Sequence, residues 1–284
     1  MYADRLAAVR SDGFYGIRRV ADIGSYDTGT LCGHGLAVGP PKAASAAGKQ
    51  YLWQTNSYGN AVHVIEVGSN KVLKRIVVGP EPHGIAAPDD ASVVYIAIEA
   101  FKKPRCELFW VNPRTYEVEH RLDIGPKPNQ LACTPDGKRV YVPRKDGHYW
   151  VIDGESRKVV EKIKTGGRPH NTQASRDGRW MYLSPMGNPK RVTIVDVKAG
   201  HKVVGHIPFS NSVRPPALSA DNKRFFQNVD GLIGFEVADI ASRKMVARIE
   251  HKIPAKFAGK SSRCHGLAIR PDQKEIWSCN VEHQ

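Results

Sequence analysis

Six residues at matched positions of the chain carry side chains that can bind ligands or transfer protons. Each one stands just before a short apolar segment, and in all of them except His34 that segment leads into a turn containing an aspartate. We call them the strand-start residues, and they are His34, His83, Asn129, His170, Arg214 and His265. The chain has 11 histidines in 284 residues, so finding four of them at six matched positions is a strong enrichment. The alignment of His34 rests on the His-Gly-Leu-Ala segment that it shares with His265.

The residue types at these positions point to three interpretations. Neutral imidazoles bind Cu, Fe or Zn, and near neutral pH they donate or accept protons. Arg214 can hold a carboxylate or phosphate with two parallel hydrogen bonds. Convergence of the six residues would therefore form a polar or anionic ligand site, or a metal site built by His34, His83, His170 and His265. In the third interpretation each imidazole only bonds a backbone carbonyl at the start of its strand.

A tandem repeat would position these side chains. The turn aspartates Asp89, Asp136, Asp177, Asp221 and Asp272 lie 47, 41, 44 and 51 residues apart. Each repeat holds four short β-branched or alternating apolar segments, separated by Gly, Asp, Asn or Pro. Four antiparallel strands in about 40–50 residues are typical of one blade of a β-propeller. We therefore predict an all-β propeller, in which Asp153 and Asp196 end third strands and bond turn amides.

The number of repeats leaves the blade count open. Five whole repeats span residues 33–79, 80–125, 126–166, 167–210 and 211–252. Residues 253–284 supply the first two strands of another blade, and residues 1–24 supply its last two, Arg5 to Val9 and Gly16 to Ile23. We predict one domain over residues 1–284, with six blades closed by this split blade. The alternative is a fragment of a seven-bladed ring.

The net charge of the chain suggests several classes of binding partner. The 42 Lys and Arg outnumber the 28 Asp and Glu, which leaves a net charge of +14. Such a surplus attracts polyanions, including nucleic acid. The basic residues are spread in pairs such as Arg144-Lys145, so a simple solvated basic surface is the other interpretation. A small anionic ligand or a protein partner fits as well. The sequence has no apolar run of about 18 residues, the length that a membrane-spanning helix requires.

The five cysteines form no CxxC motif, which zinc ribbons and thioredoxin-like proteins require. Cys264 and Cys279 flank a predicted hairpin turn, and pairing residue 267 with 276 would place them opposite each other. They are then either a disulfide or two reduced thiols. Cys32 and Cys264, next to His34 and His265, are additional candidate metal ligands or could pair with each other. The N-terminus shows no signal-peptide pattern.

The repeats resemble the YVTN-type repeats of a bacterial seven-bladed propeller family. The matching residues are the Thr-Pro-Asp-Gly-Lys-Arg-Val-Tyr-Val segment from Thr134, Val151-Ile-Asp153, and the strand-ending glycines Gly79, Gly125 and Gly166. The resemblance covers nearly the whole chain and implies a periplasmic or extracellular binding protein. Similar propellers include lactonases, lyases and dehydrogenase subunits, so a metal- or anion-dependent enzyme is the alternative. Four histidines on one ring are similar to the iron site of some seven-bladed oxygenases. The departure from the family is the count of six repeats.

Overall fold

A computed structural model describes residues 5–11, 18–19, 50–100, 105–252 and 264–280. Within these residues every regular element is a β-strand, which confirms the predicted all-β class. The described residues contain no helix with the length and apolar character needed to cross a membrane. The chain divides into two compact bodies. Body 1 comprises Met1–Asp12 and Gly35–Thr165, and body 2 comprises Gly13–His34 and Gly166–Gln284.

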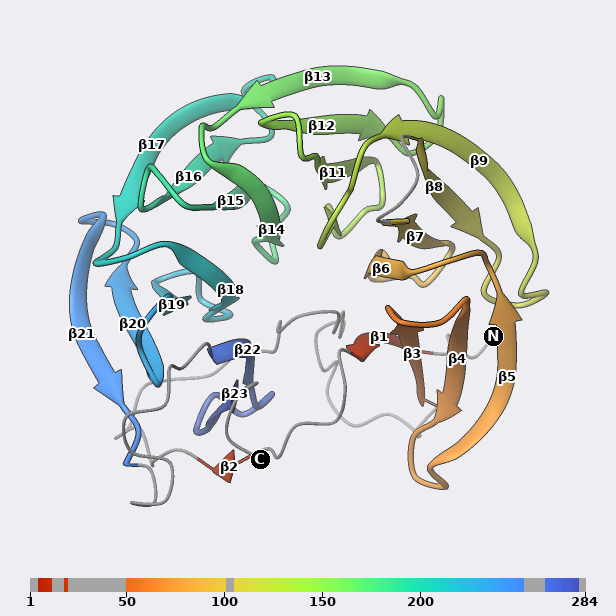
Figure 1. Ribbon diagram of the computed structural model, residues 1–284, viewed down its shortest axis with the longest axis horizontal. Coiled ribbons are helices and arrows are strands. Elements are labelled where there is room, and N and C mark those ends of the chain that lie inside the picture. The colour runs from red at the N-terminus through yellow and green to blue at the C-terminus, as the bar shows by residue number, and fades with distance from the viewer. Residues whose placement is uncertain (1–4, 12–17, 20–49, 101–104, 253–263, 281–284) are drawn as a thin grey trace. The chain divides into compact units, whose positions relative to one another are not determined.

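Body 1 contains three four-stranded sheets (Figure 1). Within each sheet the strands follow sequence order, except that β3 and not β2 comes after β1 in the first sheet. The first sheet contains β1 (Arg5–Ser11), β3 (Gln50–Asn56), β4 (Ala61–Glu66) and β5 (Lys71–Val77). The second contains β6 (Pro82–Ala86), β7 (Val94–Ile98), β8 (Cys106–Val111) and β9 (Val118–Gly125). The third contains β10 (Ala132–Cys133), β11 (Arg139–Pro143), β12 (His148–Asp153) and β13 (Val159–Lys164).

Body 2 contains two four-stranded sheets and one three-stranded sheet. The first contains β14 (Arg168–Ala174), β15 (Trp180–Met186), β16 (Arg191–Asp196) and β17 (Lys202–Pro208). The second contains β18 (Val213–Leu218), β19 (Arg224–Val229), β20 (Gly234–Asp239) and β21 (Lys244–Glu250). The three-stranded sheet contains β2 (Arg18–Arg19), β23 (Ile276–Asn280) and β22 (Cys264–Ile269), in that order.

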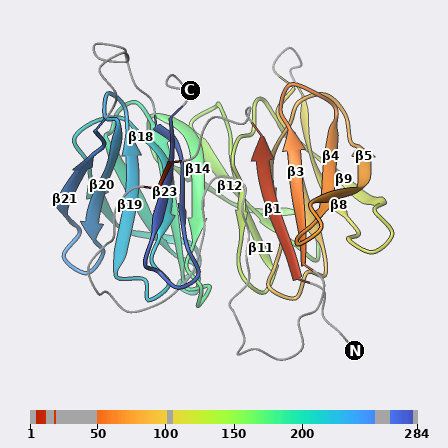
Figure 2. The ribbon, with the colours of Figure 1, turned by 90° about the horizontal axis from the view of Figure 1, so that it is seen from below.

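The described residues therefore form five four-stranded blades, not the six that the repeat count predicted. The two N-terminal strands account for the difference. The sequence placed both of them beside residues 253–284, and β2 does pair antiparallel with β23. β1 instead lies parallel to β3 (Figure 2), where it is the first strand of the first blade. The segment that follows His34, which the repeat pattern assigned to that place, lies outside the described residues.

Local chemistry explains why the blades recur. Asp136, Asp177 and Asp221 each accept a hydrogen bond from the backbone amide two positions later, which holds the turn between the first and second strands. Asp153 and Asp196 accept hydrogen bonds from the amides of Ser156 and Ala199, as the sequence predicted for third-strand ends. Each of these carboxylates satisfies donors that an open turn would otherwise leave to water.

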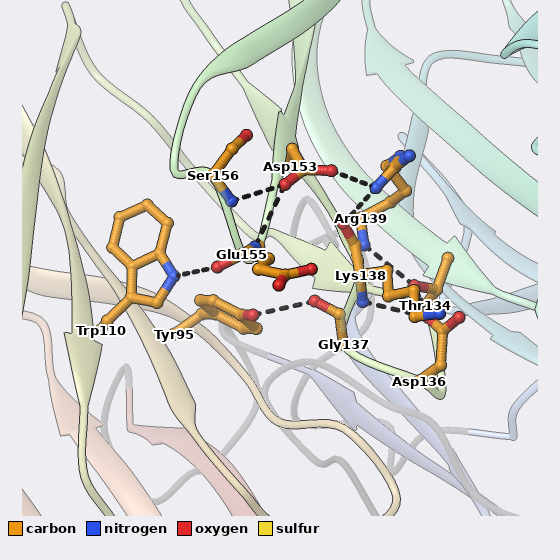
Figure 3. A network of polar contacts seen from close by, with 11 residues as sticks. Tyr95, Trp110, Thr134, Asp136, Gly137, Lys138, Arg139, Asp153, Glu155 and Ser156 are labelled. Atoms are coloured by element: carbon orange, nitrogen blue, oxygen red, sulfur yellow. Dashed lines mark hydrogen bonds and ion pairs between the residues drawn. The ribbon is translucent and has the colours of Figure 1, made fainter.

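Neighbouring blades are joined by hydrogen bonds from buried tyrosines. In body 1 the Tyr95 hydroxyl donates to the carbonyl of Gly137 in the next blade at 2.9 Å (Figure 3). In body 2 the Tyr182 hydroxyl donates to Asn222 Oδ1 of the next blade, also at 2.9 Å. Burial raises the pKa of both phenols. The first strands also pack together: β6 contacts β1, β3 and β10, and β18 contacts β14 and β22.

The fourth strand of every four-stranded blade is an exposed edge with a register shift against the third strand. The extra residues at four of these shifts are exposed and apolar, namely Leu73, Val160, Val204 and Val246. Lysines lie close by in the same strands, as Lys74 and Lys162 do. Bulges and charges of this kind keep an edge strand from pairing with another chain.

Candidate functional site

The strand-start residues fall into two groups, one in each body. His83 and Asn129 belong to body 1, and His170, Arg214 and His265 belong to body 2. His34 lies outside the described residues. Each body therefore offers its own polar group at the start of its first strands, and we take the two groups in turn.

The body 1 group is a buried cluster of His83, Asn129 and Glu99. His83 is 2% exposed, Glu99 is 5% exposed and Asn129 is 7% exposed. His83 Nε2 lies 3.2 Å from Glu99 Oε2. Asn129 Nδ2 lies 3.4 Å from both Glu99 Oε1 and His83 Nε2. An imidazole, a carboxylate and an amide from two adjacent blades thus meet at one point.

Close backbone packing brings these two blades together at the cluster. A Cβ atom added to Gly84 would collide with the carbonyl oxygen of Asn129 and would lie 2.9 Å from the amide nitrogen of Leu131. Only glycine therefore allows β6 to approach the start of the next blade this closely. On the other side of β6, the Thr55 hydroxyl donates to the carbonyl of His83 at 3.0 Å. The His-Gly pair in the sequence thus has a structural role, and the imidazole still contacts Glu99.

The chemistry of the body 1 cluster is that of an oriented acid–base pair. A carboxylate beside an imidazole fixes the orientation of the ring. Because a carboxylate only accepts hydrogen bonds, the Asn129 amide must present Nδ2 to Glu99. The opposite atom, Asn129 Oδ1, is buried and has no hydrogen-bond partner within the described part of the chain. The cluster therefore offers a buried hydrogen-bond acceptor at Asn129 Oδ1, beside the contact between His83 and Glu99.

In body 2, Arg214 is held inside its own blade by Asp230. Arg214 Nε donates to Asp230 Oδ1 at 2.6 Å, and Nη2 donates to Oδ2 at 3.1 Å. Nη1 donates to the Met186 sulfur at 2.6 Å, and Gln227 Nε2 donates to the backbone carbonyl of Arg214. The sequence predicted that this guanidinium would hold an anionic ligand. The structure shows that it already carries a bidentate carboxylate, so an added anion would have to compete with Asp230.

His170 and His265 are brought together in body 2. Their ring centroids lie 5.9 Å apart, with the rings nearly perpendicular. His170 is buried, and its Nδ1 lies 2.6 Å from the side-chain oxygen of Asn171. Since that oxygen is an acceptor, Nδ1 is the donor in this contact. Two of the predicted imidazoles therefore do meet.

The described residues add no further candidate ligands to the predicted metal site. Within the described ranges, no group of three or more His, Cys, Asp or Glu side chains is placed to hold a metal ion. No disulfide joins Cys264 and Cys279. The predicted register was wrong, because Leu267 pairs with Ser278 and Cys264 pairs with Asn280. Burial raises the pKa of the Cys279 thiol, and the nearby Cys264 raises it further. Cys32 lies outside the described residues.

Sequence reasoning missed the two carboxylates that accompany the strand-start residues. Glu99 follows His83 by sixteen positions, and Asp230 follows Arg214 by the same interval. In both blades the strand-start residue is the second residue of the first strand, and the carboxylate comes directly after the end of the second strand. The equal spacing was the signal that could have found them. It is weak in the sequence, because the matching positions of other repeats hold Lys145 and Met186.

Comparison with known proteins identifies the fold but not a family. The sequence matches no protein-family profile, and no curated protein matches it significantly. Among solved structures, Kuenenia stuttgartiensis hydrazine synthase aligns with a TM-score of 0.68 and 19% identity, over 80% of this chain and 70% of that one. The dihydro-heme d1 dehydrogenase NirN, solved in complex with DHE, aligns with a TM-score of 0.60 and 15% identity, over 84% of this chain. The fold is a β-propeller.

These likenesses extend no further than the fold. This chain spans 55% of the NirN chain, and both identities are too low to carry a function across. Both similar proteins are enzymes by name, which is compatible with either a binding or an enzymatic role for a propeller. The resemblance to YVTN repeats stays a prediction.

Proposed function

We propose that this chain is an extracytoplasmic binding protein of the YVTN type, in which His83, Glu99 and Asn129 hold a small polar ligand. The observation that supports this most strongly is the buried contact between His83 and Glu99 at 3.2 Å, beside an amide oxygen with no partner in the described chain. Burying ionisable groups is costly, and such groups gather at functional sites. His170, His265 and Arg214 form the corresponding polar group in body 2.

The basic surface is the second part of this proposal. With a net charge of +14, the chain attracts an acidic protein or a polyanion such as nucleic acid. Exposed lysines on the fourth strands, including Lys74, Lys162 and Lys244, supply part of this charge. Such contacts are independent of the His83 cluster and are tested separately.

Thermal unfolding with three defined probes tests the ligand site. Sodium acetate, glycerol and methylammonium chloride represent an anion, a neutral hydroxyl compound and a cation. We expect at least one of them to raise the melting temperature of the wild-type protein, and Asn129→Ala to abolish that rise. The control is His63→Gln, which changes a half-buried histidine on β4 of the first blade. No rise with any probe, or an equal rise in Asn129→Ala, contradicts the proposal.

A metal- or anion-dependent enzyme of the oxidoreductase, lyase or lactonase type is the second candidate. It is favoured by the contact between the His170 and His265 rings. One similar structure is named as a dihydro-heme d1 dehydrogenase, and an imidazole is a common axial ligand of haem iron. If a metal or haem binds here, it supplies the redox or Lewis-acid chemistry, and these imidazoles supply ligands.

Two measurements test the second candidate. Elemental analysis of the purified protein is expected to find Cu, Fe or Zn in a stoichiometric amount, or hemin titration is expected to shift the haem absorbance band. In either case His170→Ala should remove the signal, and His206→Ala, which changes a half-buried histidine on β17, should not. Metal-free protein that leaves the hemin spectrum unchanged would rule this candidate out.

A further inference from the structure

A cavity of about 570 Å³ lies in body 1, beside the ends of strands β5, β7, β8 and β9. Its volume is within the range of small-molecule sites, about 300–1,000 Å³. None of the lining residues belongs to the His83 cluster, although Glu99 lies between the lining residues Ile98 and Ala100 in the chain. Every residue discussed below belongs to body 1.

The floor of the cavity is apolar. Val78, Ile98, Ala100 and Cys106 line it, and each of them is at most 5% exposed. The Cys106 thiol donates to the carbonyl of Glu99 at 2.8 Å, so its one proton is already used. Burial raises the pKa of this thiol, which keeps it neutral near pH 7. Because these four side chains are already almost fully buried, they offer a ligand a small apolar contact surface.

Among the described residues, four charged side chains line the cavity, and two of them pair with each other. Arg105 Nε lies 3.5 Å from Asp123 Oδ2, and Asp123 Oδ1 accepts from the amide of Gly125 at 2.9 Å. The remaining charges are Arg121 and Glu107. Neither has an ion-pair partner within the described residues. The Arg121 guanidinium stacks 4.6 Å above the centre of the Phe109 ring, which restricts its position.

The strand register places these two charges near each other without pairing them. Phe109 is opposite Arg121, and Glu107 is opposite Asp123. Glu107 and Arg121 are therefore diagonal neighbours on the same face of the β8–β9 pair, at a separation of about 7–8 Å for such positions. One ligand that carries a positive and a negative group can contact both.

We propose that this cavity binds a small zwitterion with an apolar body, of the size and chemistry of an aliphatic α-amino acid. The ligand carboxylate bonds Arg121, its ammonium group bonds Glu107, and its side chain rests on the floor formed by Val78, Ile98, Ala100 and Cys106. The proposal does not depend on the function assigned to the His83 cluster.

Calorimetric titration of the full chain with four matched probes tests this site. Leucine carries both charges, 4-methylpentanoate lacks the ammonium group, 3-methylbutylamine lacks the carboxylate, and glycine lacks the apolar body. We expect leucine to bind at least tenfold more tightly than any of the other three. Equal affinities for leucine and either singly charged analogue, or no binding of leucine, would overturn the proposal.

Charge-removing variants locate the binding. Arg121→Gln should reduce leucine affinity to that of 3-methylbutylamine, and Glu107→Gln should reduce it to that of 4-methylpentanoate. Both residues are at least partly exposed, so these variants are expected to fold. Arg114→Gln, an exposed arginine of the same blade outside the cavity lining, is the matched control and should bind like the wild type. Leucine binding that survives both charge-removing variants would place the ligand elsewhere and contradict the assignment.

Discussion

At the scale of single residues, the structure changes what the strand-start residues can do. The sequence predicted that Arg214 would hold an anion, and Asp230 already holds it through two hydrogen bonds. The sequence predicted His83 as a ligand-binding or metal-binding residue, and the structure adds a contact with Glu99 that orients its ring. Both carboxylates stand sixteen positions after their partners. The local pairing within each blade, more than the residue type at the strand start, thus decides the chemistry.

Gly84 offers a direct test of the close packing at the cluster. We expect Gly84→Ala to lower the free energy of unfolding by about 1–3 kcal/mol, because the new methyl group meets backbone atoms that cannot move aside. Gly266→Ala is the matched control from another His-Gly pair, His265-Gly266, where the added Cβ would be 3.4 Å from the Cys279 side chain. Urea unfolding of both variants measures the difference. Equal losses would show that the approach to Asn129 is not the limiting contact.

The partly buried His251 imidazole leads us to expect that the stability of the protein depends on pH. Burial lowers the pKa of this imidazole below its usual value of 6.5, and the ring makes an edge contact with Phe235. Below about pH 6.5 the folded protein therefore binds fewer protons at His251 than the unfolded chain does. The contribution of His251 to the free energy of unfolding is fully present above about pH 6.5 and is lost as the pH falls. We expect His251→Gln to show a smaller decrease in melting temperature between pH 7.5 and pH 5.5 than the wild type. An identical decrease in both proteins would contradict this assignment.

At the scale of elements, the blade is the part that could be read most fully from the sequence. Turn aspartates, third-strand aspartates and apolar alternation are local signals, and each has a visible hydrogen-bonding role. Non-local pairing could not be read in the same way. β1 pairs in parallel with β3, and the β22–β23 hairpin has a register that differs from the predicted one. The β1–β3 pair joins residues far apart in sequence, such as Arg5 and Gln50, so the repeat pattern carried no information about it. The hairpin is local, but its register depends on the exact length of the turn, which the pairing of Ile269 with Ile276 sets.

The blade-to-blade tyrosines give a prediction about elements. Tyr95→Phe and Tyr182→Phe each remove one buried hydrogen bond to the next blade. We expect each variant to lose about 0.5–1.5 kcal/mol of unfolding free energy. Because the two bonds lie in different bodies, the double variant should lose the sum of the two. Denaturant unfolding measures all three variants, and a double variant no less stable than either single one would argue against independent links.

At the scale of the whole molecule, the net charge is the property most open to measurement. If the basic surface binds polyanions, affinity for a 20-base-pair DNA duplex should fall steeply with salt, by 10-fold or more between about 50 and 200 mM, because bound cations are released from the DNA. Fluorescence anisotropy measures this directly. The same titration with Asn129→Ala should match the wild type, since Asn129 is buried. A dissociation constant that does not change with salt would exclude nucleic acid as the partner.

The central claim is that His83, Glu99 and Asn129 bind a ligand together, and proton NMR of the imidazole rings tests it most directly. The His83 ring signals are assigned by comparison with His83→Gln, and the acetate, glycerol and methylammonium probes are then added in turn. The account predicts that at least one probe moves the His83 signals in the wild type and not in Asn129→Ala, while the His63 signals stay in place. His83 signals that move with no probe, or that move equally in Asn129→Ala, would contradict it.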